Sequence, residues 1–217
     1  MEAKDLLESL TAGLVCGFVV AVPIGPVNLT VIKQALRRGF LPAFLVGLGA
    51  MSAETIYATV LLAGHTSLLD KPAVRNPMRV LAVLVILAVG LRSLLLKEEK
   101  LEATEAKADK LDERWHHPRA FLLGFLLTIF NLGLVVLWTA LTAMLFDRDW
   151  VNSTLASRSA CSTGVFVGGA VWFFLLTFFV SRAHRRVKPK TLTTLVHISG
   201  MVLIVFAGLL AIKLFKF

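Results

Sequence analysis

Charged residues are scarce in this chain of 217 residues, and long stretches contain almost none. Only 17% of the residues are charged, whereas a soluble domain carries about 25%. Apolar residues make up 57%, which exceeds the usual fraction of about 45–50%. This balance argues against a disordered chain, a nucleic-acid-binding module and an ordinary cytosolic enzyme. We expect membrane lipid around the apolar stretches and no nucleic-acid partner.

Sequence motifs for several kinds of chemistry are also missing. No GxxxxGK[ST] loop is present, so we expect no ATP-driven step within this chain. No cluster of His, Cys and carboxylate residues has metal-ligand spacing, and we expect no metal and no cofactor. Cys16 and Cys161 are too few for a disulfide framework and are predicted to be packing residues. The acidic start lacks the features of a secretory signal, so the first apolar block is expected to be retained.

Six apolar blocks follow one another along the chain. Each approaches or exceeds the roughly 20 residues that a helix needs to cross about 30 Å of hydrocarbon. The blocks are apolar all round, whereas the strands of a membrane barrel alternate apolar and polar residues. The sequence therefore predicts an all-α integral membrane protein with six transmembrane helices. Their ranges are 6–32, 40–64, 80–96, 120–146, 159–180 and 192–214.

The basic residues predict how these helices are oriented. Of the 23 Lys and Arg residues, 15 lie in or beside the first, third and fifth gaps between the blocks, and the remainder lie on the opposite side. Because basic loops stay in the cytoplasm, we expect both termini to face outward. The net charge of +9 then reflects membrane topology rather than an acidic partner.

The third gap divides the chain into two halves. Residues 97–118 mix acidic and basic residues without a glycine, which is typical of a solvated cytoplasmic linker. Three spans in each half give the halves opposite orientations, the inverted-repeat layout that is common in transporters. We therefore expect residues 1–96 and 119–217 to form two inverted three-helix repeats. Faces of small residues would permit a homodimer without requiring one.

The first block contains residues that interrupt a helix. Pro23, Gly25 and Pro26 lie within four positions, and Asn28 follows them. Prolines free backbone groups for which lipid offers no partner, and Gly25 is expected where another backbone comes close. Two interpretations stay open: a simple proline kink, or a discontinuous helix whose free amides and carbonyls face a solute. The 11 residues up to Arg37, about 16 Å of helix, place the interruption near the middle of the membrane.

Glu54 is the only carboxylate in the interior of the six blocks. Counting along the second block also places it near mid-membrane depth. A carboxyl group there costs several kcal/mol unless it is protonated or paired. Gly47 and Ala50 share its helical face, so another helix can come close. Glu54 is therefore a candidate for binding substrate and for carrying a proton, and the alternative is a structural acid that is hydrogen-bonded between helices.

The fourth block carries one polar candidate at a similar depth. Asn131 lies 12 residues from Arg119, about 18 Å along a helix. An interhelical hydrogen bond and a ligand contact are both open interpretations for a lone asparagine.

Two glycine pairs have the spacing of helix-packing motifs. The pairs are Gly13 with Gly17 and Gly164 with Gly168, and such small residues let two membrane helices approach closely. Trp172 is predicted to be an interfacial or lipid-facing aromatic residue.

Several of these residues resemble the LysE/RhtB family of amino-acid exporters. The resemblance rests on Pro-Ile-Gly-Pro-Val-Asn at 23–28, on the basic residues after it, and on the segments 47–57 and 121–131. It implies six spans around a hydrophilic centre and secondary efflux of an amino acid or similar small zwitterion across the bacterial inner membrane, not an enzymatic reaction. The family often has proline where this chain has Leu132, and commonly has aspartate where it has Glu54. Whether the fourth helix is broken like the first is therefore open.

The leading hypothesis is a secondary exporter of amino acids or related metabolites that works by proton antiport, with Glu54 as the proton-coupling residue. The candidate substrate-binding residues are Pro23, Gly25, Pro26, Asn28, Glu54 and Asn131. A metal-ion exporter is an alternative, although one carboxylate is too few for a hard cation. A thiol–disulfide reductant carrier needs two cysteines that can approach each other, and the two cysteines lie in non-corresponding blocks. A structural or chaperone-like membrane protein would show no solute flux.

Overall fold

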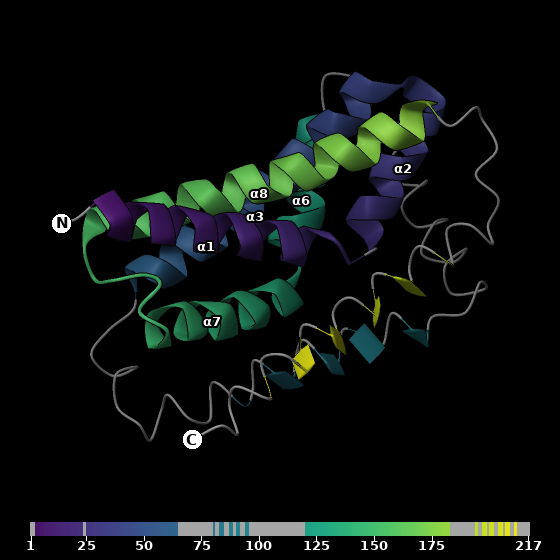
Figure 1. Cartoon of the computed structure of the whole chain (residues 1–217). Coiled ribbons are helices and arrows are strands. Elements are labelled where there is room, and N and C mark those ends of the chain that lie inside the picture. The colour runs from purple at the N-terminus through teal and green to yellow at the C-terminus, as the bar shows by residue number, and fades with distance from the viewer. Residues whose placement is uncertain are drawn as a thin grey trace.

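The computed structural model describes residues 3–23, 25–64 and 120–182, together with scattered positions between 80 and 95 and between 194 and 211 (Figure 1). The described residues form helices joined by turns, without a strand among them, which confirms the prediction of an all-α protein. The predicted linker lies outside the described residues. The helices are α1 (Ala3–Ala21), α2 (Pro26–Arg38), α3 (Phe40–Ala63), α6 (Ala120–Ile129), α7 (Leu132–Asp147) and α8 (Leu155–Arg182).

Two of these helices, α3 and α8, are continuous and apolar enough to cross a membrane. They contain 24 and 28 residues, about 36 and 42 Å of helix. The first and fourth predicted blocks are instead bent pairs of helices. Helices α1 and α2 meet at 77°, and α6 and α7 meet at 71°. The bend between Ala21 and Pro26 is termed the first break, and the bend between Ile129 and Leu132 the second break.

The contacts between helices fix their relative directions. Gly47 and Met51 of α3 face Phe173 and Gly169 of α8, respectively, so the two continuous helices run antiparallel. Helix α1 runs parallel to α8 along its length, as the two adjacent ribbons in Figure 1 show. Helix α6 runs parallel to α3, against which it packs. Each broken pair therefore packs on the continuous helix of the other half of the chain.

Glycines make both of these parallel contacts possible. A Cβ atom at Gly13 or Gly17 of α1, or at Gly164 or Gly168 of α8, would overlap the backbone of the opposite helix. The predicted packing role of the two glycine pairs is confirmed. The contact between α3 and α6 uses the same kind of approach.

That second contact rests on Gly49 and Gly124, which do not belong to the two predicted glycine pairs. A Cβ atom on Gly49 would overlap the backbone of α6 at Phe121, and one on Gly124 would overlap the backbone of α3 at Val46. Lipid tails are as apolar as leucine side chains, so close packing holds membrane helices together more than burial of apolar surface does.

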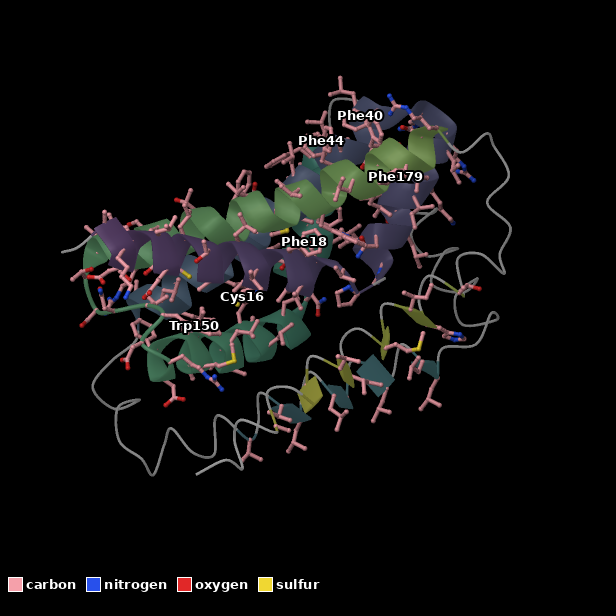
Figure 2. All side chains as sticks on the ribbon, in the orientation of Figure 1. Cys16, Phe18, Phe40, Phe44, Trp150 and Phe179 are labelled. Carbon is pink, nitrogen blue, oxygen red and sulfur yellow. The ribbon has the colours of Figure 1, made fainter. Side chains whose placement is uncertain are left out.

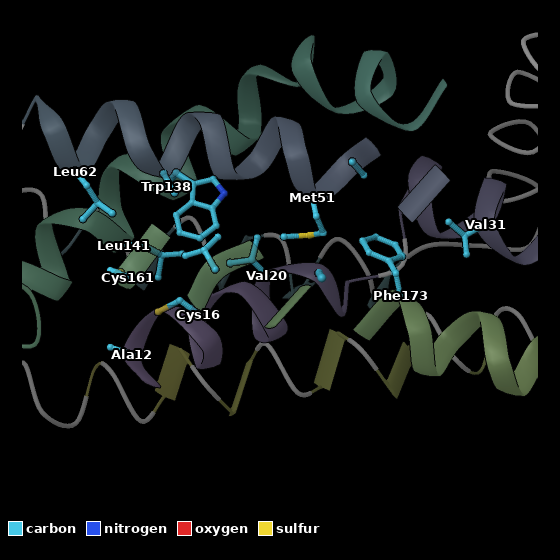
Figure 3. Close-up of a cluster of buried hydrophobic side chains, with 14 of the residues drawn as sticks. Ala12, Cys16, Val20, Val31, Met51, Leu62, Trp138, Leu141, Cys161 and Phe173 are labelled. Atoms are coloured by element: carbon cyan, nitrogen blue, oxygen red, sulfur yellow. The ribbon is translucent and has the colours of Figure 1, made fainter. Parts of the chain in front are cut away.

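The interior is filled by apolar side chains from most of the helices. Trp138 of α7, Met51 of α3 and Phe173 of α8 are almost fully buried in one cluster (Figure 3). Cys16 and Cys161 are free, buried thiols of the same cluster, which confirms their predicted packing role. Large apolar side chains such as Phe179 project from the outer surface (Figure 2), as expected where lipid is the solvent.

Candidate functional site

The first break combines a proline with an extended glycine. Pro26 occupies the first position of α2, where a missing N–H costs nothing. Gly25 has φ −115° and ψ −165°, an extended conformation that residues before proline commonly adopt. A Cβ atom on Gly25 would meet no atom of the described residues within 4 Å. The close backbone approach expected at Gly25 is therefore wrong for the described part of the chain, where the space beside Gly25 is open.

The Asn28 side chain forms hydrogen bonds with backbone carbonyls at the first break. Its Nδ2 donates to the carbonyl oxygens of Ala21 at 3.0 Å and Pro23 at 2.7 Å, two carbonyls at the end of α1. Its Oδ1 accepts a hydrogen bond of 3.0 Å from the indole Nε1 of Trp172 on α8. The side chain is 4% exposed. Backbone groups freed inside a membrane need hydrogen-bond partners in the protein, and the Asn28 amide is the partner of two such carbonyls.

Trp172 was expected at the membrane interface or facing lipid, and this expectation is wrong. Its indole N–H is used by Asn28, and its ring packs edge-on against Phe18 of α1 at 5.7 Å between centroids. Trp172 lies about 5 Å from the midpoint of α8, measured along the helix. Counting residues along α2 does not measure depth, because α2 is bent away from α1. The bond to Trp172 nevertheless places Asn28 at the level of the middle of a continuous span.

The second break forms without a proline. The Asn131 side chain caps α7 by accepting a hydrogen bond of 3.2 Å from the backbone N–H of Gly133. The Asn131 backbone N–H donates to the carbonyl of Thr128 at 2.9 Å. The hydroxyl of Tyr57 on α3 donates to the carbonyl of Ile129, the last residue of α6. The fourth block is thus broken like the first, and an asparagine cap and a tyrosine hydroxyl take the place of a proline.

Glu54 is buried next to Trp138 of α7, the helix that follows the second break. Its side chain is 6% exposed, lies about 4 Å from the midpoint of α3, and has a buried Oε2 without a hydrogen-bond partner among the described residues. The indole of Trp138 on α7 lies next to this carboxyl group, yet no hydrogen bond of ordinary geometry joins them. Within the same described region, Thr128 Oγ1 and Thr142 Oγ1 are also buried without partners. Buried polar groups are rarely left in this state.

The predicted site residues fall into separate groups. Pro23, Gly25, Pro26 and Asn28 belong to the first break, and Asn131 is exposed at the second break. Glu54 adjoins α7, and no hydrogen bond among the described residues links its side chain with Asn28 or Asn131.

Sequence reasoning missed the aromatic partners at both breaks and at Glu54. One available signal was Tyr57, the single tyrosine of the chain, which follows Glu54 by three residues and so lies close to the same helical face. In the described part of the chain, no group of three His, Cys, Asp or Glu side chains could hold a metal ion.

Comparisons with known proteins identify a family and two similar proteins. The sequence matches the family described as LysE type translocator over residues 18–214. It is similar to the "Putative amino acid efflux protein YcgF" of Bacillus subtilis, with 24% identity over 193 residues that cover 89% of this chain and 90% of that protein. The "Chemotactic transduction protein ChpE" of Pseudomonas aeruginosa is 25% identical over 180 residues, 83% of this chain and 86% of that protein. No solved structure gives a significant match.

Proposed function

Because this chain belongs to the LysE type translocator family, we propose that it exports amino acids or related small zwitterionic metabolites. The proposed route leads from the cytoplasm across the bacterial inner membrane, with both termini outside. Export is driven by exchange with protons. A multi-pass protein of transporter ancestry without an ATP-binding loop needs such a secondary driving force.

The observation that carries this proposal is the buried carboxyl group of Glu54. An unpartnered polar group in a protein interior costs about 1–3 kcal/mol, and more if it is charged. Glu54 Oε2, Trp138 Nε1 and Thr128 Oγ1 all lack partners in the region described, near a helix that is already broken. A ligand that offers donors and acceptors would remove this cost. An ammonium group suits the carboxylate, and hydrogen-bond acceptors of the same ligand suit the indole N–H and the hydroxyl.

The two breaks supply further groups for a zwitterion. Helices α2 and α7 both begin inside the span rather than at its edge, and helix N-termini carry a partial positive charge. The first turn of α2 has no side-chain cap, since Gly25 is its N-cap residue. The open space beside Gly25 lies at this end of α2. We assign this end to the carboxylate of the substrate and Glu54 to its ammonium group.

Six spans in two inverted halves are the architecture that we propose for residues 1–96 and 119–217. Helix α6 runs parallel to α3, so Gly64 and Ala120 lie at opposite ends of this helix pair, as one further span between them in the sequence would require. The crossed packing of each broken pair on the continuous helix of the other half is the pattern that an inverted repeat produces.

Proton coupling follows from competition at one carboxyl group. Glu54 binds a proton or the substrate ammonium group, and not both together. A transporter that must exchange one for the other at a single site couples their movements in opposite directions.

The test is efflux from reconstituted vesicles loaded with a panel of labelled amino acids, with and without a proton gradient. We expect gradient-driven efflux of at least one panel member. Glu54→Gln keeps the size of the side chain but cannot titrate, and should lower gradient-driven efflux about tenfold or more, because a charge-assisted interaction contributes about 1.5–3 kcal/mol. Glu54→Asp should retain part of the activity.

Glu8→Gln is the matched control, because Glu8 is an exposed acid on α1 that pairs with Lys4 at 3.8 Å. It should transport like the unmodified protein. A Glu54→Gln variant that still responds fully to the gradient would remove Glu54 from the mechanism. Absence of flux for the whole panel would overturn the proposed substrate class.

A further inference from the structure

The two breaks are held in corresponding ways by the two continuous helices. At the first break, Trp172 of α8 donates to Asn28, which in turn donates to the carbonyls of Ala21 and Pro23. At the second break, Tyr57 of α3 donates directly to the carbonyl of Ile129. In both cases an aromatic side chain with one polar hydrogen reaches from a continuous helix to the break in the other half of the chain.

The two aromatic residues lie at different levels of the membrane. The contacts of Gly47 with Phe173 and of Gly169 with Met51 align α3 with α8, and this alignment places Trp172 opposite residue 48. Tyr57 lies nine residues further along α3, so the two levels are separated by about 13 Å. Since the midpoint of α3 falls between these levels, one aromatic residue acts on each side of the centre of the span.

We infer that Trp172 and Tyr57 are positioning residues for transport, each of which fixes the backbone of one break from the opposite half of the protein. The role in transport rests on the proposed function, whereas the effect of the two residues on the breaks does not. Each residue acts through backbone carbonyls and, at the first break, through Asn28. Neither residue has to touch the substrate.

Each break has its own hydrogen bond from a continuous helix, so one break can be weakened while the other keeps its stability. Removing the Tyr57 hydroxyl leaves the carbonyl of Ile129 without this donor, while the hydrogen bonds of Asn28 are unchanged. Removing the Trp172 indole N–H has the converse effect. A transporter that opens one side at a time must loosen one break while the other stays bonded, and two separate hydrogen bonds on opposite sides of the centre allow this.

Hydrogen–deuterium exchange of the full-length protein in lipid nanodiscs tests the inference without a substrate. Tyr57→Phe should speed amide exchange about fivefold in peptides that cover residues 129–134, and leave peptides that cover 25–29 unchanged. Trp172→Phe should have the reverse pattern. Fivefold is the change expected when one neutral hydrogen bond is lost from a local opening equilibrium.

Two matched variants control for loss of a polar group elsewhere. Thr55→Val removes a hydroxyl from α3 that, among the described residues, bonds to the carbonyl of Met51 in its own helix. Trp150→Phe removes an indole from the exposed turn after α7. Both should leave exchange at the two breaks unchanged.

If either variant lowered stability in general, amide exchange would become faster at both breaks alike. That result would overturn the inference, and so would unchanged exchange at both breaks. In vesicles, the two variants should lower the maximal rate of efflux and leave the half-saturating concentration nearly unchanged. A shift confined to the half-saturating concentration would assign the residue to the substrate site instead. Crossed exchange effects without any flux would leave the positioning role intact and refute the proposed function.

Discussion

The first and second breaks reach similar geometry from different sequences. The first has Pro23 and Pro26 and bends by 77°, whereas the second has no proline and bends by 71°. At both breaks, side chains take up carbonyls that the interrupted helix releases: Asn28 at the first and Tyr57 at the second. The comparison teaches that a proline is one way to start a break. Partners for the released carbonyls are what both breaks share.

The breaks differ in how much they leave unsatisfied. At the first break, all hydrogen-bonding groups of the Asn28 side chain are used. The open space at this break lies beside Gly25. Around the second break, Thr128 Oγ1 and the neighbouring Glu54 and Trp138 have buried polar atoms without partners in the residues described. The first break therefore offers room, and the second offers unpaired chemical groups. A zwitterion with two charged ends could use both.

The largest effect is expected from filling the room at the first break. Gly25→Leu should abolish efflux, because the side chain would occupy the open space where we place the substrate carboxylate. Gly25→Ala should transport nearly normally, since its Cβ would meet no atom and its extended backbone suits alanine. Initial efflux rates at matched protein levels in vesicles measure both.

Gly133 provides the comparison at the second break. A Cβ atom there would meet only the Asn131 side-chain oxygen at 3.2 Å, so Gly133→Ala should cause a small loss of flux. Normal efflux by well-inserted Gly25→Leu would show that the space beside Gly25 is not part of the solute route.

Residue types and block lengths predicted much of this architecture. Apolar blocks gave the positions of α3 and α8 within a few residues, and small-residue spacing predicted the packing role of the glycines at which α1 and α8 meet. The first break was anticipated because proline acts locally on its own helix. The second was left open, because it has no proline and the carbonyl of Ile129 is bonded by Tyr57, which is 72 residues away in the chain.

The candidate site shows the same division between local and distant effects. Glu54 stood out in the sequence because a carboxyl group in an apolar block is rare. Its neighbour Trp138 did not, because an apolar helix with tryptophan is ordinary until the fold places the indole beside an acid. The function of Asn28 as a carbonyl partner likewise required the position of Trp172.

An intermediate effect should separate the two asparagines. Asn28→Ala leaves two carbonyls and the Trp172 indole without partners, and should lower stability by about 1–3 kcal/mol or more, because each unsatisfied buried group carries a cost of that order. Asn131→Ala loses one helix cap at an exposed position, which costs about 1 kcal/mol. Unfolding of the purified proteins in mixed detergent micelles measures the difference.

Transport kinetics add a second readout for this pair. Asn131→Ala should raise the half-saturating substrate concentration more than it lowers the yield of folded protein, if Asn131 contacts the solute. Equal destabilisation by the two substitutions would contradict the view that the first break depends more on its asparagine than the second.

The smallest effect is expected from Pro26→Ala. Proline at the first helical position supplies a favourable φ angle but no hydrogen bond, and alanine at this position keeps the helix intact. The second break shows that an interruption can persist without proline when its carbonyls are bonded, and Asn28 would still bond Ala21 and Pro23 in this variant. Stability should therefore change by only about 0.5–1 kcal/mol, mainly through the greater freedom of the unfolded chain, and efflux should stay within about twofold of the unmodified protein. Amide exchange at residues 25–29 should stay slow in Pro26→Ala, in contrast to its rise in Trp172→Phe. If exchange instead rises more in Pro26→Ala than in Trp172→Phe, then the proline, and not the side-chain partner, maintains the first break.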